Sequence, residues 1–208
     1  MGRGTAKKLI LGVLGSTRGT DLQAIIDAAE SGALNAKIAL VVSDKKDAFI
    51  IERAKKHGIE TLFSDYKGQG SKAGTEKVFA QEFRKRKVDL VLLIGFMKIL
   101  SPYFVREFRH RIWNIHPSLL PKYAGGMNMD VHAQVIANRE KETGCTLHEV
   151  SEEVDAGQII MQKKTNVTPN DTPDTLKKKV QNLEQECFLE AIKMVIEGKL
   201  VIGEPSEN

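Results

Sequence analysis

Cysteine is scarce in this chain of 208 residues, which contains only Cys145 and Cys187. Two cysteines are too few for a disulfide framework, and such scarcity is typical of a reducing compartment. We therefore expect both to be buried as small apolar residues. No apolar segment approaches the ~18 residues of a membrane helix, and the apolar run after the basic N-terminus lacks a small-residue cleavage site. These absences predict a cytoplasmic protein with no membrane partner.

Several common active-site signatures are also missing. The glycine-containing turn at residues 15–21 matches neither G-x-G-x-x-G nor a Walker loop, which disfavours dinucleotides and nucleoside triphosphates. Ser118 lacks the G-x-S-x-G elbow of serine hydrolases. His132 and His148 have no partner at zinc spacing. We therefore predict no metal site, and a structural role for both histidines.

Charge is nearly balanced, with 31 Lys and Arg against 27 Asp and Glu. The resulting net charge of +4 favours anionic small molecules but falls short of the basic stripe of a nucleic-acid-binding protein. Small molecules are therefore the expected partners, with no nucleic acid. With 41% hydrophobic residues, the chain can build one well-buried core, so we expect a single domain over residues 1–208 with a loose polar tail at 204–208.

Apolar runs alternate with amphipathic segments through the first half of the chain. Continuous apolar strands separated by such helices indicate a parallel sheet covered on both faces. Strands are predicted at 9–14, 36–42, 59–64, 88–96 and 111–115, and helices at 21–32, 48–58, 75–87 and 102–108.

The second half changes pattern after a loop rich in Gly and Met at residues 124–130. It predicts a helix at 131–140, two neighbouring strands at 144–150 and 157–167, and a last helix at 171–200, capped by Asp171 or Thr172. The fold class is therefore α/β: a Rossmann-like doubly wound, mostly parallel sheet with a C-terminal antiparallel extension and a long final helix.

The turn at residues 15–21 is the first candidate site. It joins a strand to a helix, so its backbone N–H groups and the positive helix end can face an anion, with Thr20 or Asp21 as the helix cap. An ordinary strand-to-helix turn is an equally good interpretation of the position alone.

Asn114 and His116 are the second candidate site. Residues i and i+2 at the end of a strand point to the same side, so an amide and an imidazole can converge on one atom. Both can donate to an oxyanion, and histidine can also move the proton that acyl transfer to an amine releases. The alternative is a histidine that only satisfies a loop carbonyl.

Asp155 is the third candidate, in the sequence "SEEVDAG". Asp and Gly are favoured in turns, so the residue could serve the turn alone. If it faces His116, its carboxylate orients the imidazole and favours the charged ring, which would make a catalytic pair.

Three stretches carry a resemblance to a known family. "LIGFMKILSPYFV", "RIWNIHPSLLPKY" and "HEVSEEVDAGQIIMQ" resemble the phosphoribosylglycinamide formyltransferases of purine synthesis, with similarity from about Leu9 to Leu200. The resemblance implies transfer of a formyl group from 10-formyltetrahydrofolate, the co-substrate, to the amine of glycinamide ribonucleotide. It also implies that Asn114, His116 and Asp155 form the catalytic trio, in a monomer or a homodimer.

The resemblance further assigns the two halves of the chain and their contacts. Residues 1–100 would be the phosphate-binding half and residues 101–203 the catalytic and folate-binding half. Implied folate contacts are Lys72, Met97, Lys98, Ile99, Leu100, Asn114, Ser151, Glu152, Glu153, Val154 and Asp155. Implied ribonucleotide contacts are Gly19, Thr20, Asp21, Gln181, Asn182, Leu183 and Glu184, with Glu184 anchoring the glycinamide end.

The sequence departs from the family pattern in two places. Arg18 is added and Asp21 replaces an asparagine in the phosphate loop, so we expect Arg18 to offset the charge of Asp21. Lys72 stands where arginine is common and lacks its bidentate fork. The alternatives are a formyltransferase acting on an amino sugar nucleotide or a methionyl-tRNA, a formyltetrahydrofolate deformylase, and a non-catalytic ligand sensor.

Overall fold

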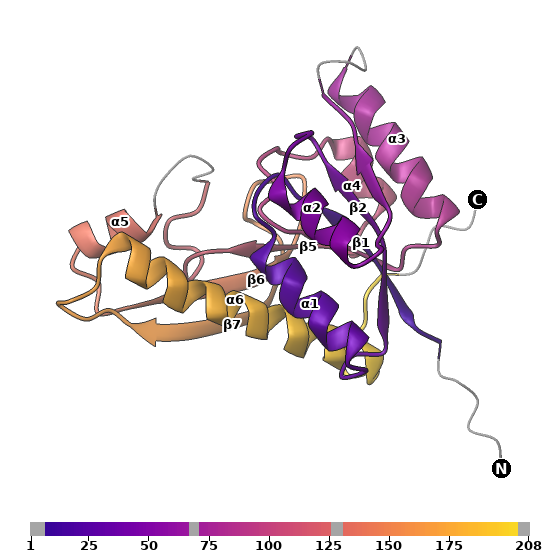
Figure 1. The fold of residues 1–208 in the computed structure, drawn as a ribbon. Coiled ribbons are helices and arrows are strands. Elements are labelled where there is room, and N and C mark those ends of the chain that lie inside the picture. The colour runs from indigo at the N-terminus through magenta and orange to yellow at the C-terminus, as the bar shows by residue number, and fades with distance from the viewer. Residues whose placement is uncertain (1–6, 67–70, 126–130, 204–208) are drawn as a thin grey trace.

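The computed structural model describes residues 7–66, 71–125 and 131–203. Among these residues one sheet has the strand order β3-β2-β1-β4-β5-β6-β7 (Figure 1). The strands are β1 (Leu9–Leu14), β2 (Ala36–Ser43), β3 (Thr61–Phe63), β4 (Leu90–Leu93), β5 (Ile112–His116), β6 (Glu142–Glu149) and β7 (Ile159–Asn166).

The strands from β3 through β5 pair in parallel, whereas β6 and β7 pair antiparallel. This arrangement confirms the predicted fold class. The helices that connect and cover the strands are α1 (Thr20–Glu30), α2 (Phe49–Lys56), α3 (Lys72–Lys85), α4 (Pro102–Glu107), α5 (Val131–Ala137) and α6 (Pro173–Ile196). None of the described helices has the length and apolar character that crossing a membrane requires.

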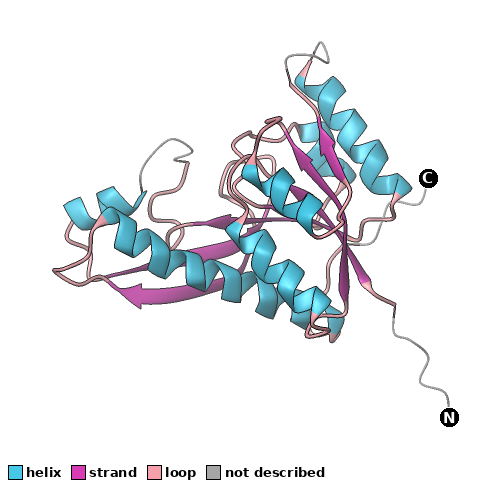
Figure 2. Ribbon diagram, in the orientation of Figure 1, coloured by secondary structure: helices cyan, strands magenta, loops and turns pink. Residues whose placement is uncertain are grey.

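Apolar side chains divide the helices between the two faces of the sheet. On one face α1, α2 and α6 pack together, with Ile25, Ile50 and Phe188 in a single buried cluster. On the other face α3 and α4 place Phe83 and Phe104 against the strands. Figure 2 shows α6 running along the antiparallel strands β6 and β7. Helix α6 contacts both of these strands and also packs against α1. Helix α6 therefore joins the two halves of the chain.

The strand order places a switch point between β1 and β4. The chain moves outward through β2 and β3 and then returns to β4 on the other side of β1. The connections after β1 and after β4 consequently diverge at the carboxyl ends of adjacent strands, where open α/β sheets bind ligands. Strand β5 lies next to β4 and ends at His116, so it delivers the Asn114 and His116 side chains to the same edge.

Three predicted helix boundaries differ from the structure by three residues or more. Helix α3 begins at Lys72, three residues before the predicted start, because the Ser71 hydroxyl accepts the Gly74 N–H and caps the helix there. Helix α5 ends at Ala137 rather than at Glu140, and helix α6 ends at Ile196 rather than at Leu200. Its predicted start is confirmed, since Thr172 and Thr175 form a reciprocal capping box.

Cys145 and Cys187 are fully buried, as expected, with 3.6 Å between their sulfur atoms. The tail at 204–208 and most of the Gly- and Met-rich loop, residues 126–130, lie outside the described residues.

Candidate active site

A cavity of about 690 Å³ opens at the switch point. Its walls come from the turn after β1, the segment after β4, the end of β5, the loop between β6 and β7, and one face of α6. The predicted site residues that line it are Gly19, Thr20, Asp21, Met97, Lys98, Ile99, Leu100, Asn114, His116, Ser151, Glu152, Glu153, Val154, Asp155, Gln181 and Glu184.

Three predicted contacts do not line this cavity. Lys72 is exposed in the first turn of α3. Asn182 is exposed, and Leu183 packs against the apolar core. Successive helical residues turn by about 100°, so Gln181 and Glu184 share the face of α6 that meets the cavity while the two residues between them point elsewhere.

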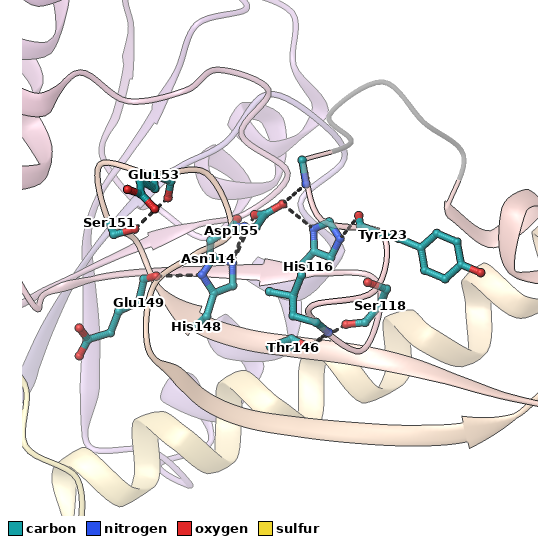
Figure 3. A network of polar contacts seen from close by, with 12 residues as sticks. Asn114, His116, Ser118, Tyr123, Thr146, His148, Glu149, Ser151, Glu153 and Asp155 are labelled. Carbon is teal, nitrogen blue, oxygen red and sulfur yellow. Dashed lines mark hydrogen bonds and ion pairs between the residues drawn. The ribbon is translucent and has the colours of Figure 1, made fainter.

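His116 lies between two acceptors at the centre of Figure 3. Its Nε2 donates to the Tyr123 carbonyl at 2.9 Å, and its Nδ1 is 3.4 Å from Asp155 Oδ2. Only a doubly protonated ring could donate to both acceptors. The His116 and Asp155 side chains are 7% and 10% exposed, so little water screens this pair.

Asp155 is held by its own loop and by the segment that follows β5. Its φ of 54° lies in the left-handed region, an unusual conformation for a residue other than glycine. The Gly125 N–H donates to Oδ2 at 2.9 Å. A Cβ at Gly157 would come within 1.8 Å of the Glu149 carbonyl oxygen, so only glycine lets the loop pack this closely against β6. The loop thus presents the Asp155 carboxylate to the histidine from a fixed backbone.

His148 completes this cluster, although the sequence indicated only a structural role for it. Its Nδ1 donates to the Glu149 carbonyl at 2.8 Å, so its Nε2 is free to accept the Asn114 Nδ2–H at 3.2 Å (Figure 3). Burial lowers the pKa of His148, which keeps the ring neutral. His148 therefore orients the Asn114 amide, and its Nε2 also lies 3.6 Å from Asp155 Oδ1.

The antiparallel register explains why the sequence did not reveal His148. Asn114 on β5 stands directly opposite His148 on β6. Paired strands bring side chains on one face close together, but the register depends on how the strands meet. Asn114 and His148 are 34 positions apart in the sequence, and no local pattern encodes their pairing.

The segment after β4 forms an apolar wall of the cavity. Met97 and Ile99 are 39% and 50% exposed, while Leu100 is buried. The Met97 N–H donates to the Ser16 hydroxyl at 3.0 Å, which ties this wall to the turn after β1. At its other end, the buried Glu76 carboxylate accepts the Ser101 N–H at 2.8 Å. The wall is therefore anchored at both ends, with two large apolar side chains exposed.

The loop from Ser151 to Asp155 forms the opposite wall. Its Ser151 hydroxyl donates to the Glu153 carbonyl at 2.8 Å, and Glu152 pairs with Arg106 of α4 at 3.3 Å. Val154 is 43% exposed and adds another apolar surface to the cavity. A flat, partly apolar ligand can therefore lie between the two walls.

The first turn of α1 forms the far end of the cavity, and the predicted cap is wrong. Neither Thr20 nor Asp21 caps the helix; the N-cap is Gly19, with a φ of 66° and no side-chain cap. The Ile50 side chain explains this choice, because a Cβ at Gly19 would lie 2.5 Å from it. The first N–H groups of α1 are therefore left for a ligand.

Asp21 and Glu184 lie together at this end of the cavity. Burial raises the pKa of Asp21 to about 7. Burial and the negative charge of Asp21 raise the pKa of Glu184 well above its usual value, against the opposing effect of Lys177. Among the described residues the structure gives no direct contact for the expected compensation by Arg18, because burial is the cause of the Asp21 shift and the Arg18 guanidinium lies 6.0 Å from the centre of the exposed Phe49 ring. Arg18 is exposed, so solvent satisfies it instead.

A family model described as Formyl transferase matches residues 9–192. A phosphoribosylglycinamide formyltransferase from Haemophilus influenzae is 39% identical over 190 residues, which cover 91% of this chain and 88% of that protein. The chain belongs to the formyl transferase family. The resemblance seen in the sequence is thereby confirmed.

Structural comparison agrees with this membership. Glycinamide ribonucleotide transformylase 1 from Symbiobacterium toebii matches with a TM-score of 0.89 at 35% identity, covering 97% of this chain and 93% of that one. The trifunctional purine biosynthetic protein adenosine-3 of Drosophila melanogaster is 39% identical over 193 residues, but this formyl transferase chain spans only 14% of that protein's length.

Proposed function

We propose that this formyl transferase moves the formyl group of 10-formyltetrahydrofolate to the amine of glycinamide ribonucleotide, a step of purine biosynthesis. The observation that carries the proposal is the meeting of Asn114, His116 and Asp155 in one cavity whose far end is a helix start. Relatives of similar length carry the matching name, among them phosphoribosylglycinamide formyltransferases from Haemophilus influenzae and Escherichia coli. The cytoplasmic location and the monomer or homodimer state stay predictions.

The two walls suit the folate co-substrate. Met97, Ile99 and Val154 offer apolar surface to a flat ring system. The co-substrate supplies an activated formyl carbon. Its formyl end would lie beside Asn114 and His116, which are at the inner end of both walls.

The cluster around His116 suits direct attack by an amine. As the amine adds to the formyl carbon, negative charge develops on the formyl oxygen, and the Asn114 amide and His116 ring are donors that can stabilise it. For this the His116 ring must release the Tyr123 carbonyl or move toward the substrate. Asp155 stabilises the charged ring and can take the proton that the attacking amine sheds, directly or through water. The proton taken from the amine then passes, directly or through water, to folate N10, which leaves protonated, and no covalent enzyme intermediate is needed.

The far end of the cavity suits the acceptor. The unsatisfied N–H groups at the start of α1 favour the phosphate, and Gln181 and Glu184 face the same space from α6. The amine would then lie between this end and His116. Binding both substrates in one cavity converts their encounter into a reaction within one complex.

An activity assay tests the proposal. Purified protein is mixed with 10-formyltetrahydrofolate, and absorbance follows loss of the formyl group with and without glycinamide ribonucleotide. We expect loss only when the ribonucleotide is present, and a large fall in rate for His116→Ala. Equal loss without the amine would identify a deformylase instead, and loss with an amino sugar nucleotide alone would change the acceptor.

A further inference from the structure

Asp21 is an unusual side chain for an anion site. Its carboxyl lies in the first turn of α1, is 5% exposed, and lines the cavity. Within the described part of the chain, its Oδ1 is buried and accepts no hydrogen bond. Glu184 of α6 is 9% exposed and faces the same end of the cavity. Two nearly buried carboxyl groups therefore stand where the proposed function requires a phosphate.

Few cations surround this carboxyl pair. From α6, Lys177 favours the charged form of Glu184, while Cys187 opposes it. From α2, the side chain of Arg53 bonds to Gln23 and to the Arg18 carbonyl. The other ionisable side chains of α2, and Lys37 on β2, are exposed. Beyond β2, the Asp44 carboxylate accepts the Ser16 hydroxyl at 2.6 Å.

We propose that Asp21 is a specificity-determining residue that admits an anionic phosphosugar only when its own carboxyl is protonated, so that acceptor binding takes up a proton. The proposal rests on the proposed function, because the phosphate of the acceptor is the anion concerned. A carboxylate at Asp21 would repel that anion, whereas the neutral carboxyl can donate a hydrogen bond to it or to Glu184. The asparagine expected here from the family resemblance cannot ionise, so it would give no such coupling.

The raised pKa of Asp21, about 7, places the effect in an accessible range. At pH 8 about nine-tenths of the free protein would carry ionised Asp21, and binding would take up about 0.9 proton. The apparent Kd should rise about fivefold between pH 7 and pH 8, because the fraction of binding-competent protein falls by that factor. The phosphate itself adds little at pH 8, since its second pKa is near 6.

Calorimetry with ribose 5-phosphate tests this coupling without the reactive amine or the folate. Titrations at pH 8 in two buffers with different ionisation enthalpies give the number of protons taken up. Wild-type protein should take up about 0.9 proton more than Asp21→Asn, which keeps Glu184 as the one ionisable carboxyl of the pair, and the Kd of the variant should rise less between pH 7 and pH 8 than the Kd of the wild type. Asp27→Asn is the matched control, because it makes the same change at an exposed position of the same helix and should behave as wild type. Thermal unfolding of each variant confirms that it is folded.

The outcomes separate this inference from the proposed function. Equal proton uptake by wild type and Asp21→Asn, or none by either, would overturn the inference. Absence of ribose 5-phosphate binding at pH 6 would overturn it as well. A parallel assay of formyl transfer to glycinamide ribonucleotide at pH 6.5 then shows whether the proposed function survives on its own.

Discussion

Replacing Asp155 with asparagine is the sharpest perturbation of the cluster around His116. The change preserves the size of the side chain, and the amide oxygen can still accept the Gly125 N–H. It removes the negative charge that lies 3.4 Å from the ring. Two unit charges at this separation attract by about 5 kcal/mol at an effective dielectric constant of 20, which sets an upper bound. We expect kcat to fall by about 10² to 10³, equivalent to roughly 3–4 kcal/mol.

Steady-state kinetics with both substrates measures this effect. His116→Ala should be at least as damaging as Asp155→Asn, and the double variant should lose little beyond His116→Ala alone, because both changes act through one imidazole. Glu142→Gln, the same chemical change at an exposed position of β6, should leave kcat nearly unchanged. A double variant that shows the full product of the two single losses would refute the reasoning and leave Asp155 with an independent role, such as holding its loop.

Three further predictions follow from buried polar groups. Because burial raises the pKa of Asp21 to about 7, the unfolding free energy of the wild type should decline as the pH rises from 4 to 7. Asp21→Asn should increase the unfolding free energy by up to about 4 kcal/mol at pH 8 but little at pH 4. Urea denaturation at the two pH values measures the difference. His148→Leu removes the acceptor for the Asn114 amide, so kcat should fall about tenfold. His148→Gln supplies another acceptor and should partly restore kcat. Equal kcat values for the two variants would contradict an orienting role for His148. Glu76→Ala leaves the buried donors of Ser101 without an acceptor, so the unfolding free energy should fall by about 2–4 kcal/mol. Denaturant titration measures this loss, and an unchanged midpoint would contradict the prediction.

The order and type of the elements could be predicted from the sequence because local patterns carry them. Uninterrupted apolar runs such as β4 indicate strands buried on both faces, and the Thr172–Pro173 pair signals the start of α6. The start of α3 was less predictable. Gly74 in the first turn of α3 lowers its helix propensity, and the Ser71 cap and the buried Glu76 override this weakness.

The site could be predicted where one strand carries both of its residues. Asn114 and His116 share a face of β5 by alternation alone, whereas His148 joins them only through the register of β6. The side-chain environment of Asp21 was equally hidden, since the packing of α6 against α1 decides that Glu184, and not Arg18, is its neighbour. Such contacts depend on tertiary packing, which no short sequence pattern specifies.

The most direct measurement of the central claim is mass spectrometry of the acceptor. Wild-type protein is incubated with glycinamide ribonucleotide and 10-formyltetrahydrofolate labelled with ¹³C in the formyl group. The account predicts that the label appears on the ribonucleotide amine, with His116→Ala as the inactive control. Label released as free formate, with the ribonucleotide unchanged, would contradict it.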